Sequence, residues 1–272
     1  MLKQTGRQMA GTVAVITEGA GPLGQAVARR LGAACTHVLL ADASATAARP
    51  VLDELARTRQ LHGLDEEPAF VRADATSEDG ARTVVHAALD RFGRVDVVVH
   101  VATLELQGAD APALDVAPLA PMTRWAAAAL SLQAEGNLVL GALVRDRWPG
   151  PLTAAAREAA SAAFGGFVHA AAQRLYDLGL CVNGLQVEDG AGAAERTLEL
   201  AGVRAQQPSP ALYDAAQAAR FLASPEARGV SGQVLYLSGD RPMEGAPYLR
   251  PPASAQAGGY GTLLGSIHRL AP

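Results

Sequence analysis

One stretch near the N-terminus constrains the fold more than any other part of the sequence. Residues 13–16 form an apolar run, and a turn containing Gly19, Gly21 and Gly24 follows it. A helical pattern over 25–31 continues directly from this turn. The order of strand, glycine turn and helix directs backbone N–H groups and a helix N-terminus at a phosphate group. The stretch therefore predicts a parallel α/β sheet that binds a nucleotide diphosphate.

An acidic residue after the next apolar run supports this interpretation. Asp42 follows the apolar residues 37–41. A dinucleotide-binding fold keeps a carboxylate at about this place to bind the ribose hydroxyls of adenosine. The alternative is an ordinary strand–helix turn followed by a solvated aspartate.

Composition narrows the class of protein. The 272 residues are enough for one α/β domain, and with only 4% aromatic residues the core must be built from Ala, Val and Leu. The net charge is −4 and no basic run is longer than Arg29-Arg30, which argues against binding to nucleic acid. Cys35 and Cys181 are expected to be buried thiols in a reducing compartment rather than a disulfide or metal site. With no apolar leader or membrane-spanning run, we expect a cytoplasmic protein.

Alternating strand and helix patterns predict a doubly wound parallel sheet of seven strands with helices on both faces. This domain is expected over 1–240, followed by a C-terminal extension over 241–272 rich in Pro, Gly and Ala. The expected strands are 13–16, 37–41, 69–73, 95–101, 137–144, 180–185 and 233–237. The expected helices are 25–31, 45–60, 77–92, 122–134, 152–177, 191–202 and 210–224.

The helix expected over 152–177 is unusually apolar. It carries no formal charge from 159 to 173 and is apolar almost all the way round. Such a helix must be covered on two sides, by its own sheet and by a second surface. We expect Phe164, Phe167 and Val168, among Ala and Gly, to form the outer face.

Five segments in register resemble the short-chain dehydrogenase/reductase family, and the likeness covers about residues 10–240. They are the loop 17–24, Asp74, and the stretches 92–99, 179–183 and 230–237. The resemblance implies a Rossmann fold and an NAD-type cofactor. Its cofactor-binding positions are carried over to Thr17, Gly19, Gly21, Leu23, Gly24, Asp42, Asp74, His100 and Ala102.

The chemistry of the resembling family needs a Tyr acid/base, a Lys four residues later, a Ser and an Asn. Family spacing counted from Asn183 and Trp125 places these at Arg157, Ser161, Val144 and Leu132. An arginine stays protonated and cannot shuttle a proton, and a valine has no donor. Glu18 also stands where the family keeps a glycine, and its charge would repel a diphosphate. The comparison therefore predicts no catalytic residues, no metal, and either no cofactor or weakly bound NAD.

Three functions follow from this comparison. The leading hypothesis is a non-catalytic subunit that assembles, through the helix over 152–177, with an active NAD-dependent alcohol or hydroxyacyl-CoA dehydrogenase. The second is an active NAD(P)-dependent oxidoreductase that uses unusual groups such as His100 and Arg157. The third is a nucleotide-sensing regulator that retains Asp42 and Asp74 for the adenosine half.

Three polar features have two interpretations each. His100 is either a catalytic base or a satisfied core residue, and the second is favoured for a lone histidine in a strand. Glu188-Asp189 is either a ligand site or an exposed turn, and Arg157 binds either a carboxylate or CoA phosphate, or an acidic partner in a salt bridge. His169 is expected to serve packing.

Overall fold

The computed structural model of the chain describes residues 9, 11–34, 37–61, 66–107, 113–133, 135–146, 153–188, 196–200, 203–207 and 209–237. The predicted extension over 241–272, Cys35 and Asp189 lie outside the described residues.

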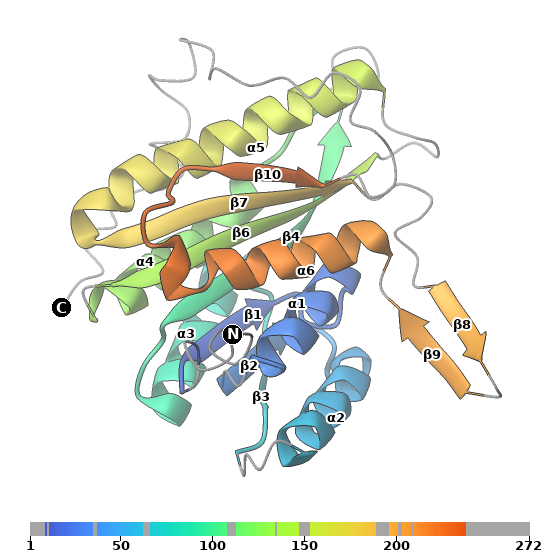
Figure 1. The fold of residues 1–272 in the computed structure, drawn as a ribbon. Helices are drawn as coiled ribbons and strands as arrows, with labels where there is room; N and C mark the ends of the chain where they lie inside the picture. Colours follow the sequence, from blue (N-terminus) through green and yellow to red (C-terminus); the bar gives the residue numbers. More distant parts are fainter. Residues whose placement is uncertain are drawn as a thin grey trace.

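A parallel sheet forms the centre of the fold (Figure 1). Its strands are β1 (Val13–Thr17), β2 (His37–Asp42), β3 (Ala69–Arg72), β4 (Val97–Gln107), β6 (Gly136–Asp146), β7 (Leu180–Glu188) and β10 (Val234–Leu237). They lie in the order β10-β7-β6-β4-β1-β2-β3, and each neighbouring pair is parallel. The predicted seven strands are confirmed, and the short β5 (Ala113–Leu114) adds an eighth, antiparallel to β4. Because the order reverses between β1 and β4, the crevice at their carboxyl ends is the expected ligand site.

Helices cover both faces of the sheet (Figure 1). One layer contains α1 (Pro22–Gly32), α2 (Ala45–Leu61) and α6 (Pro210–Leu222). The other contains α3 (Glu78–Phe92), α4 (Ala120–Ser131) and α5 (Ala154–Leu175). Short 3-10 turns occur at Ala117–Leu119, Tyr176–Leu178 and Pro225–Ala227. No helix in the described part of the chain is both long and apolar enough to cross a bilayer.

Local sequence signals explain where these elements begin and end. Ser77 caps α3 by accepting a hydrogen bond from the Gly80 N–H at 3.1 Å. Gly93 ends the same helix with a φ of 73°, which a glycine adopts without a Cβ penalty. All of β1 and the four central residues of β2 are buried, as expected where helices cover both faces.

The predicted helix over 191–202 is wrong. Its described part is β8 (Arg196–Leu200), which pairs antiparallel with β9 (Val203–Gln207) in a separate two-stranded sheet. Figure 1 draws this hairpin apart from the main sheet. Apolar and polar residues alternate from Thr197 to Leu200, and that period belongs to a strand rather than a helix.

The packing of α5 corrects the prediction about its outer face. Phe164, Phe167 and Val168 are each 0% exposed and belong to the core between α5 and the sheet. Gly184 of β7 makes room for them, because a Cβ there would lie 2.9 Å from Phe164 and 2.8 Å from Val168. The side of α5 that faces away from the sheet contains the small residues Ala162 and Gly166, which are half-buried within this chain, and also the exposed Gln173.

Cys181 also departs from the expectation of a buried thiol. It is half-buried, and its Sγ donates a hydrogen bond to the Arg228 carbonyl at 3.3 Å. The pairing of β10 with β7 begins only at Gly184, so no strand in the described part of the chain pairs with the first residues of β7 on that side.

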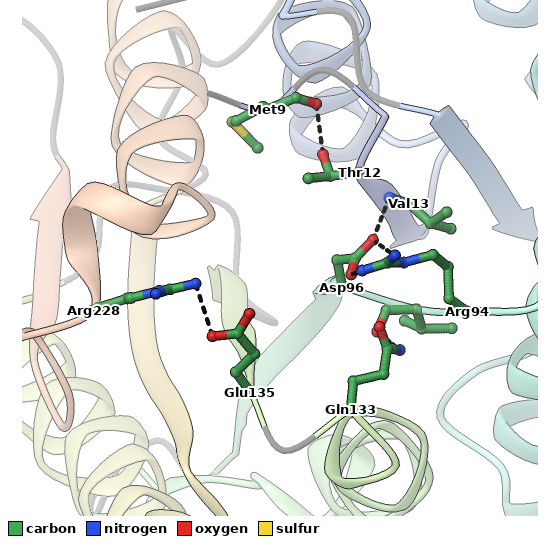
Figure 2. A network of polar contacts seen from close by, with 9 residues as sticks. Met9, Thr12, Val13, Arg94, Asp96, Gln133, Glu135 and Arg228 are labelled. Carbon is green, nitrogen blue, oxygen red and sulfur yellow. Dashed lines mark hydrogen bonds and ion pairs between the residues drawn. The ribbon is translucent and has the colours of Figure 1, made fainter. Parts of the chain in front are cut away.

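A polar network joins elements at the amino ends of the strands (Figure 2). Asp96 precedes β4, and its Oδ2 accepts a hydrogen bond from the Val13 N–H at 2.8 Å. The same carboxylate is paired with Arg94. Nearby, Gln133 donates to the Val95 carbonyl, and Arg228 is paired with Glu135 at 2.7 Å. Asp96 thus satisfies the first N–H of β1 at the edge opposite the expected ligand site.

Replacing Asp96 with alanine is expected to lower the free energy of unfolding by about 1–3 kcal/mol, because it leaves the buried Val13 N–H without its acceptor. Urea titration followed by circular dichroism measures the change. Asp53→Ala is the control, since its exposed pair with Arg49 contributes at most about 1 kcal/mol. Equal losses in the two variants would contradict this role for Asp96.

Candidate functional site

The glycine turn packs tightly against the ends of β1 and β2. The Gly19 N–H donates to the Ala41 carbonyl at 3.1 Å, and the Gly21 N–H donates to the Glu18 carbonyl at 2.9 Å. A Cβ on Gly24 would lie 2.1 Å from that same Glu18 carbonyl oxygen, so only glycine fits there. Pro22 follows at the first position of α1 and has no N–H group. The turn predicted from sequence is therefore present, but several of its backbone donors are used within the chain.

Asp42 and Asp74 lie at the carboxyl edge as predicted. Asp42 accepts hydrogen bonds from the Ala20 N–H at 2.9 Å and the Ser44 N–H at 2.8 Å, so it holds the glycine turn against β2. Asp74 is exposed and accepts from the backbone and hydroxyl of Thr76. Both carboxylates remain at the crevice, with some of their acceptor positions used locally.

Glu18 turns its side chain inward across the crevice. Its Oε1 accepts from the Thr103 N–H and its Oε2 from the Thr103 hydroxyl, both at 2.9 Å. The Oε2 also lies 3.9 Å from where a Cβ of Gly21 would be, so the carboxylate stands over the glycine turn. The φ of Glu18 is 45°, a left-handed conformation that costs a residue with a side chain about 1 kcal/mol or more.

The charge of Glu18 is partly desolvated. Burial raises the pKa of the Glu18 carboxyl, and the two hydrogen bonds from Thr103 oppose that rise. Asp42 raises this pKa further, whereas Arg145 of β6 lowers it.

His100 is a buried core residue, but only one of its two ring nitrogens has a hydrogen-bond partner among the described residues, so it is not the fully satisfied histidine that was expected. It is 0% exposed, and its Nδ1 lies 2.8 Å from the Thr17 hydroxyl. The Thr17 hydroxyl donates its proton to the Val101 carbonyl at 2.9 Å, so it can only accept from His100. In this arrangement Nδ1 therefore carries the ring proton. Nε2 is buried without a hydrogen-bond partner among the described residues. Burial lowers the pKa of His100 to about 4, and the Pro118 backbone and Asp74 act in the opposite direction.

Three of the four positions carried over for catalysis lie toward the carboxyl edge. Val144 is buried in β6, Arg157 is half-buried in the first turns of α5, and Ser161 follows one turn later. Leu132 lies elsewhere: it directly follows α4 and is 56% exposed, near the amino end of β6. Counting from Trp125 fails here because α4 ends at Ser131 and the next strand begins at Gly136. Leu132 is therefore not part of this site.

Sequence reasoning missed two polar residues beside Ser161. Gln186 of β7 is 2% exposed, and its Nε2 donates to the Ser161 Oγ at 3.3 Å. Tyr236 of the adjacent strand β10 is paired with Gln186, and its hydroxyl donates to the Ser161 carbonyl at 3.4 Å. Burial raises the pKa of the Tyr236 phenol. An interior glutamine in an apolar strand was the available sequence signal for this group.

The family model described as short chain dehydrogenase matches residues 12–129. Over 243 residues the chain is 32% identical to the (2S)-[(R)-hydroxy(phenyl)methyl]succinyl-CoA dehydrogenase subunit BbsC of Thauera aromatica, covering 85% of this chain and 94% of that protein. The chain belongs to the short-chain dehydrogenase/reductase family. It is also 38% identical over 96 residues to human 3-hydroxyacyl-CoA dehydrogenase type-2. The match spans about a third of that relative's length.

Solved structures agree with this family at the level of the fold. The chain superposes on a hydroxysteroid dehydrogenase from Escherichia coli with a TM-score of 0.64 and 24% identity, over 88% of this chain and 98% of that one. A short-chain type dehydrogenase/reductase from Mycobacterium marinum gives a TM-score of 0.65 with 19% identity, over 85% of this chain and 95% of that one.

Short-chain dehydrogenases normally bind NAD(P), and the two ends of the crevice fit such a cofactor differently. Asp42 is the last residue of β2 and lies where an adenosine ribose would be held. The glycine turn does not fit the diphosphate, because the Glu18 carboxylate stands over it. We therefore derive no chemical step through the cofactor. Among the described residues no group of three His, Cys, Asp or Glu side chains is placed to hold a metal ion.

Proposed function

We propose that this chain is a non-catalytic member of the short-chain dehydrogenase/reductase family that assembles with an active NAD-dependent dehydrogenase subunit. The active subunit would oxidise an alcohol, in particular a hydroxyacyl-CoA ester. In this proposal the chain stabilises its partner or shapes the partner's substrate pocket.

The observation that carries the proposal is that the family's catalytic positions hold no pair of residues that can transfer a proton. Arg157 stays protonated near neutral pH, and Val144 has no polar side-chain atom. Ser161 is buried and bonded to Gln186, so its hydroxyl is engaged inside the chain. These residues cannot perform the acid/base step that the family resemblance implies.

The outer face of α5 supports assembly. Ala162 and Gly166 lie opposite the buried phenylalanines and present small residues that let a second helix approach closely. Burying such a face contributes about 25 cal/mol per Å² of apolar area. The name of the Thauera aromatica relative, a dehydrogenase subunit, also favours this reading.

Co-expression with active family members tests the proposal. The chain is expected to co-purify with one of them, and native mass spectrometry should show a complex that contains both chains. Ala162→Glu should disrupt the complex without lowering the melting temperature of the isolated chain. Ala56→Glu, at a half-buried alanine on α2, is the matched control and should leave the complex intact.

A stable solitary monomer in every co-expression would contradict the proposal. So would steady NADH production by the chain alone, which would favour the alternative of an active oxidoreductase. The partial match to a 3-hydroxyacyl-CoA dehydrogenase is what favours that alternative. His100 does not support it, because a fully buried ring cannot reach a substrate.

A further inference from the structure

We propose that Glu18 is a specificity-determining residue whose carboxylate prevents a diphosphate from binding at the glycine turn. This chain therefore excludes dinucleotides, although it keeps Asp42 and Asp74, the acidic residues of the adenosine side. The inference concerns this chain alone and does not depend on whether the chain assembles with a partner.

The first support is the direction of the Glu18 side chain. A glutamate in this turn could extend into solvent, but here both carboxylate oxygens are bound to Thr103 on β4. The bond joins the turn after β1 to the neighbouring strand across the switch point of the sheet. A pair of hydrogen bonds to one residue, including a backbone N–H, holds the carboxylate in place.

The second support is where the carboxylate lies. Its Oε2 stands 3.9 Å from the Cβ position of Gly21, directly over the turn that precedes α1. The N-terminus of a helix attracts an anion, and in this chain the glutamate itself supplies one. A diphosphate placed there would meet a fixed negative charge at close range.

The third support is the use of the backbone donors. The N–H groups of Gly19, Ala20 and Gly21 donate to Ala41, Asp42 and Glu18 respectively. Pro22 has no N–H, so at most those of Leu23 and Gly24 remain at the start of α1. The turn therefore has few free N–H donors to bind a phosphate, and these do not offset the repulsion by the Glu18 carboxylate.

The expected size of the effect follows from Coulomb's law. A charge about 6 Å from a phosphate, at an effective dielectric constant of about 20, weakens binding roughly a hundredfold. Removing the charge should therefore raise the affinity by about this factor for ligands that carry a diphosphate. The affinity for ligands without a diphosphate should not change.

Isothermal titration calorimetry of the full chain tests this inference with three ligands: NAD, ADP-ribose and adenosine. Glu18→Gln removes the charge at nearly constant size, and Glu18→Gly also relieves the left-handed backbone. Both variants should bind NAD and ADP-ribose roughly a hundredfold more tightly than the unmodified chain. Their affinity for adenosine should not change.

Glu105→Gln is the matched control, because it removes an exposed carboxylate two residues beyond Thr103 without touching the turn. It should leave the affinity for NAD within about twofold of the unmodified chain. Circular dichroism and melting curves establish that each variant is folded. An unchanged affinity for NAD in both folded Glu18 variants would overturn the inference, and so would an equal gain for adenosine.

Discussion

Replacing Phe164 with alanine is expected to lower the free energy of unfolding of the isolated chain by about 3–5 kcal/mol. The ring is 0% exposed between α5 and the sheet, where it fills the space that Gly184 leaves open. Removing it leaves a cavity that the neighbouring Val168 and Val234 cannot fill without moving. Chemical denaturation of the chain alone, in the absence of any partner, measures this loss.

The same experiment distinguishes the two faces of α5. If Phe164 pointed outward to a partner subunit, its replacement would weaken the complex and leave the isolated chain nearly as stable. Ala162→Glu provides the contrast, because Ala162 lies on the outer side and a change there is expected to alter stability by less than about 1 kcal/mol. A loss below about 1 kcal/mol in Phe164→Ala would contradict the packing described for α5.

Much of the fold was predictable because its signals are local. The apolar runs of β1 and β2, the cap at Ser77 and the stop at Gly93 each specify structure within a few residues. The long α5 shows the limit of such signals. A helix that is apolar almost all round carries no periodicity that says which side faces the sheet, so its outer face was predicted wrongly.

The length of β4 depends on the neighbouring strand β6 rather than on the hydrophobic pattern of its own residues. Polar residues after Val101 ended the apolar run and suggested that the strand stops there. In the structure β4 continues to Gln107, because β6 runs beside it in register as far as the pair of Leu106 and Asp146. Backbone hydrogen bonds to an adjacent strand hold residues that their own sequence would not place in a strand.

The candidate site likewise contains some features that the local sequence predicts and others that depend on contacts between distant segments. Asp42 and the glycine turn were predicted, since strand, turn and helix are consecutive in the chain. The inward direction of Glu18 depends on Thr103, and the group of Ser161, Gln186 and Tyr236 joins three separate elements. Contacts of this kind follow from the strand order, which the sequence pattern alone does not contain.

Acidification is expected to destabilise the chain through His100, by up to about 3 kcal/mol between pH 6.5 and pH 4. In the folded chain burial lowers the pKa of this ring from 6.5 to about 4, whereas the unfolded chain titrates near 6.5. Below pH 6.5 the unfolded state therefore binds the proton first, and each pH unit of that difference contributes about 1.4 kcal/mol. The stability is fully present above pH 6.5 and is lost as the pH falls toward 4.

Urea titrations at pH 7, 5.5 and 4.5 measure this slope, and His100→Asn tests its origin. Asparagine can still donate to the Thr17 hydroxyl, but it does not titrate, so the variant should lose less stability on acidification than the unmodified chain. His169→Asn, at a half-buried position on α5, should keep the original slope. A steep slope that survives in His100→Asn would place the acid sensitivity elsewhere. A flattened slope would show that the buried His100 is stable only in its neutral form, in which its ring is hydrogen-bonded to Thr17 and so joins β4 to β1.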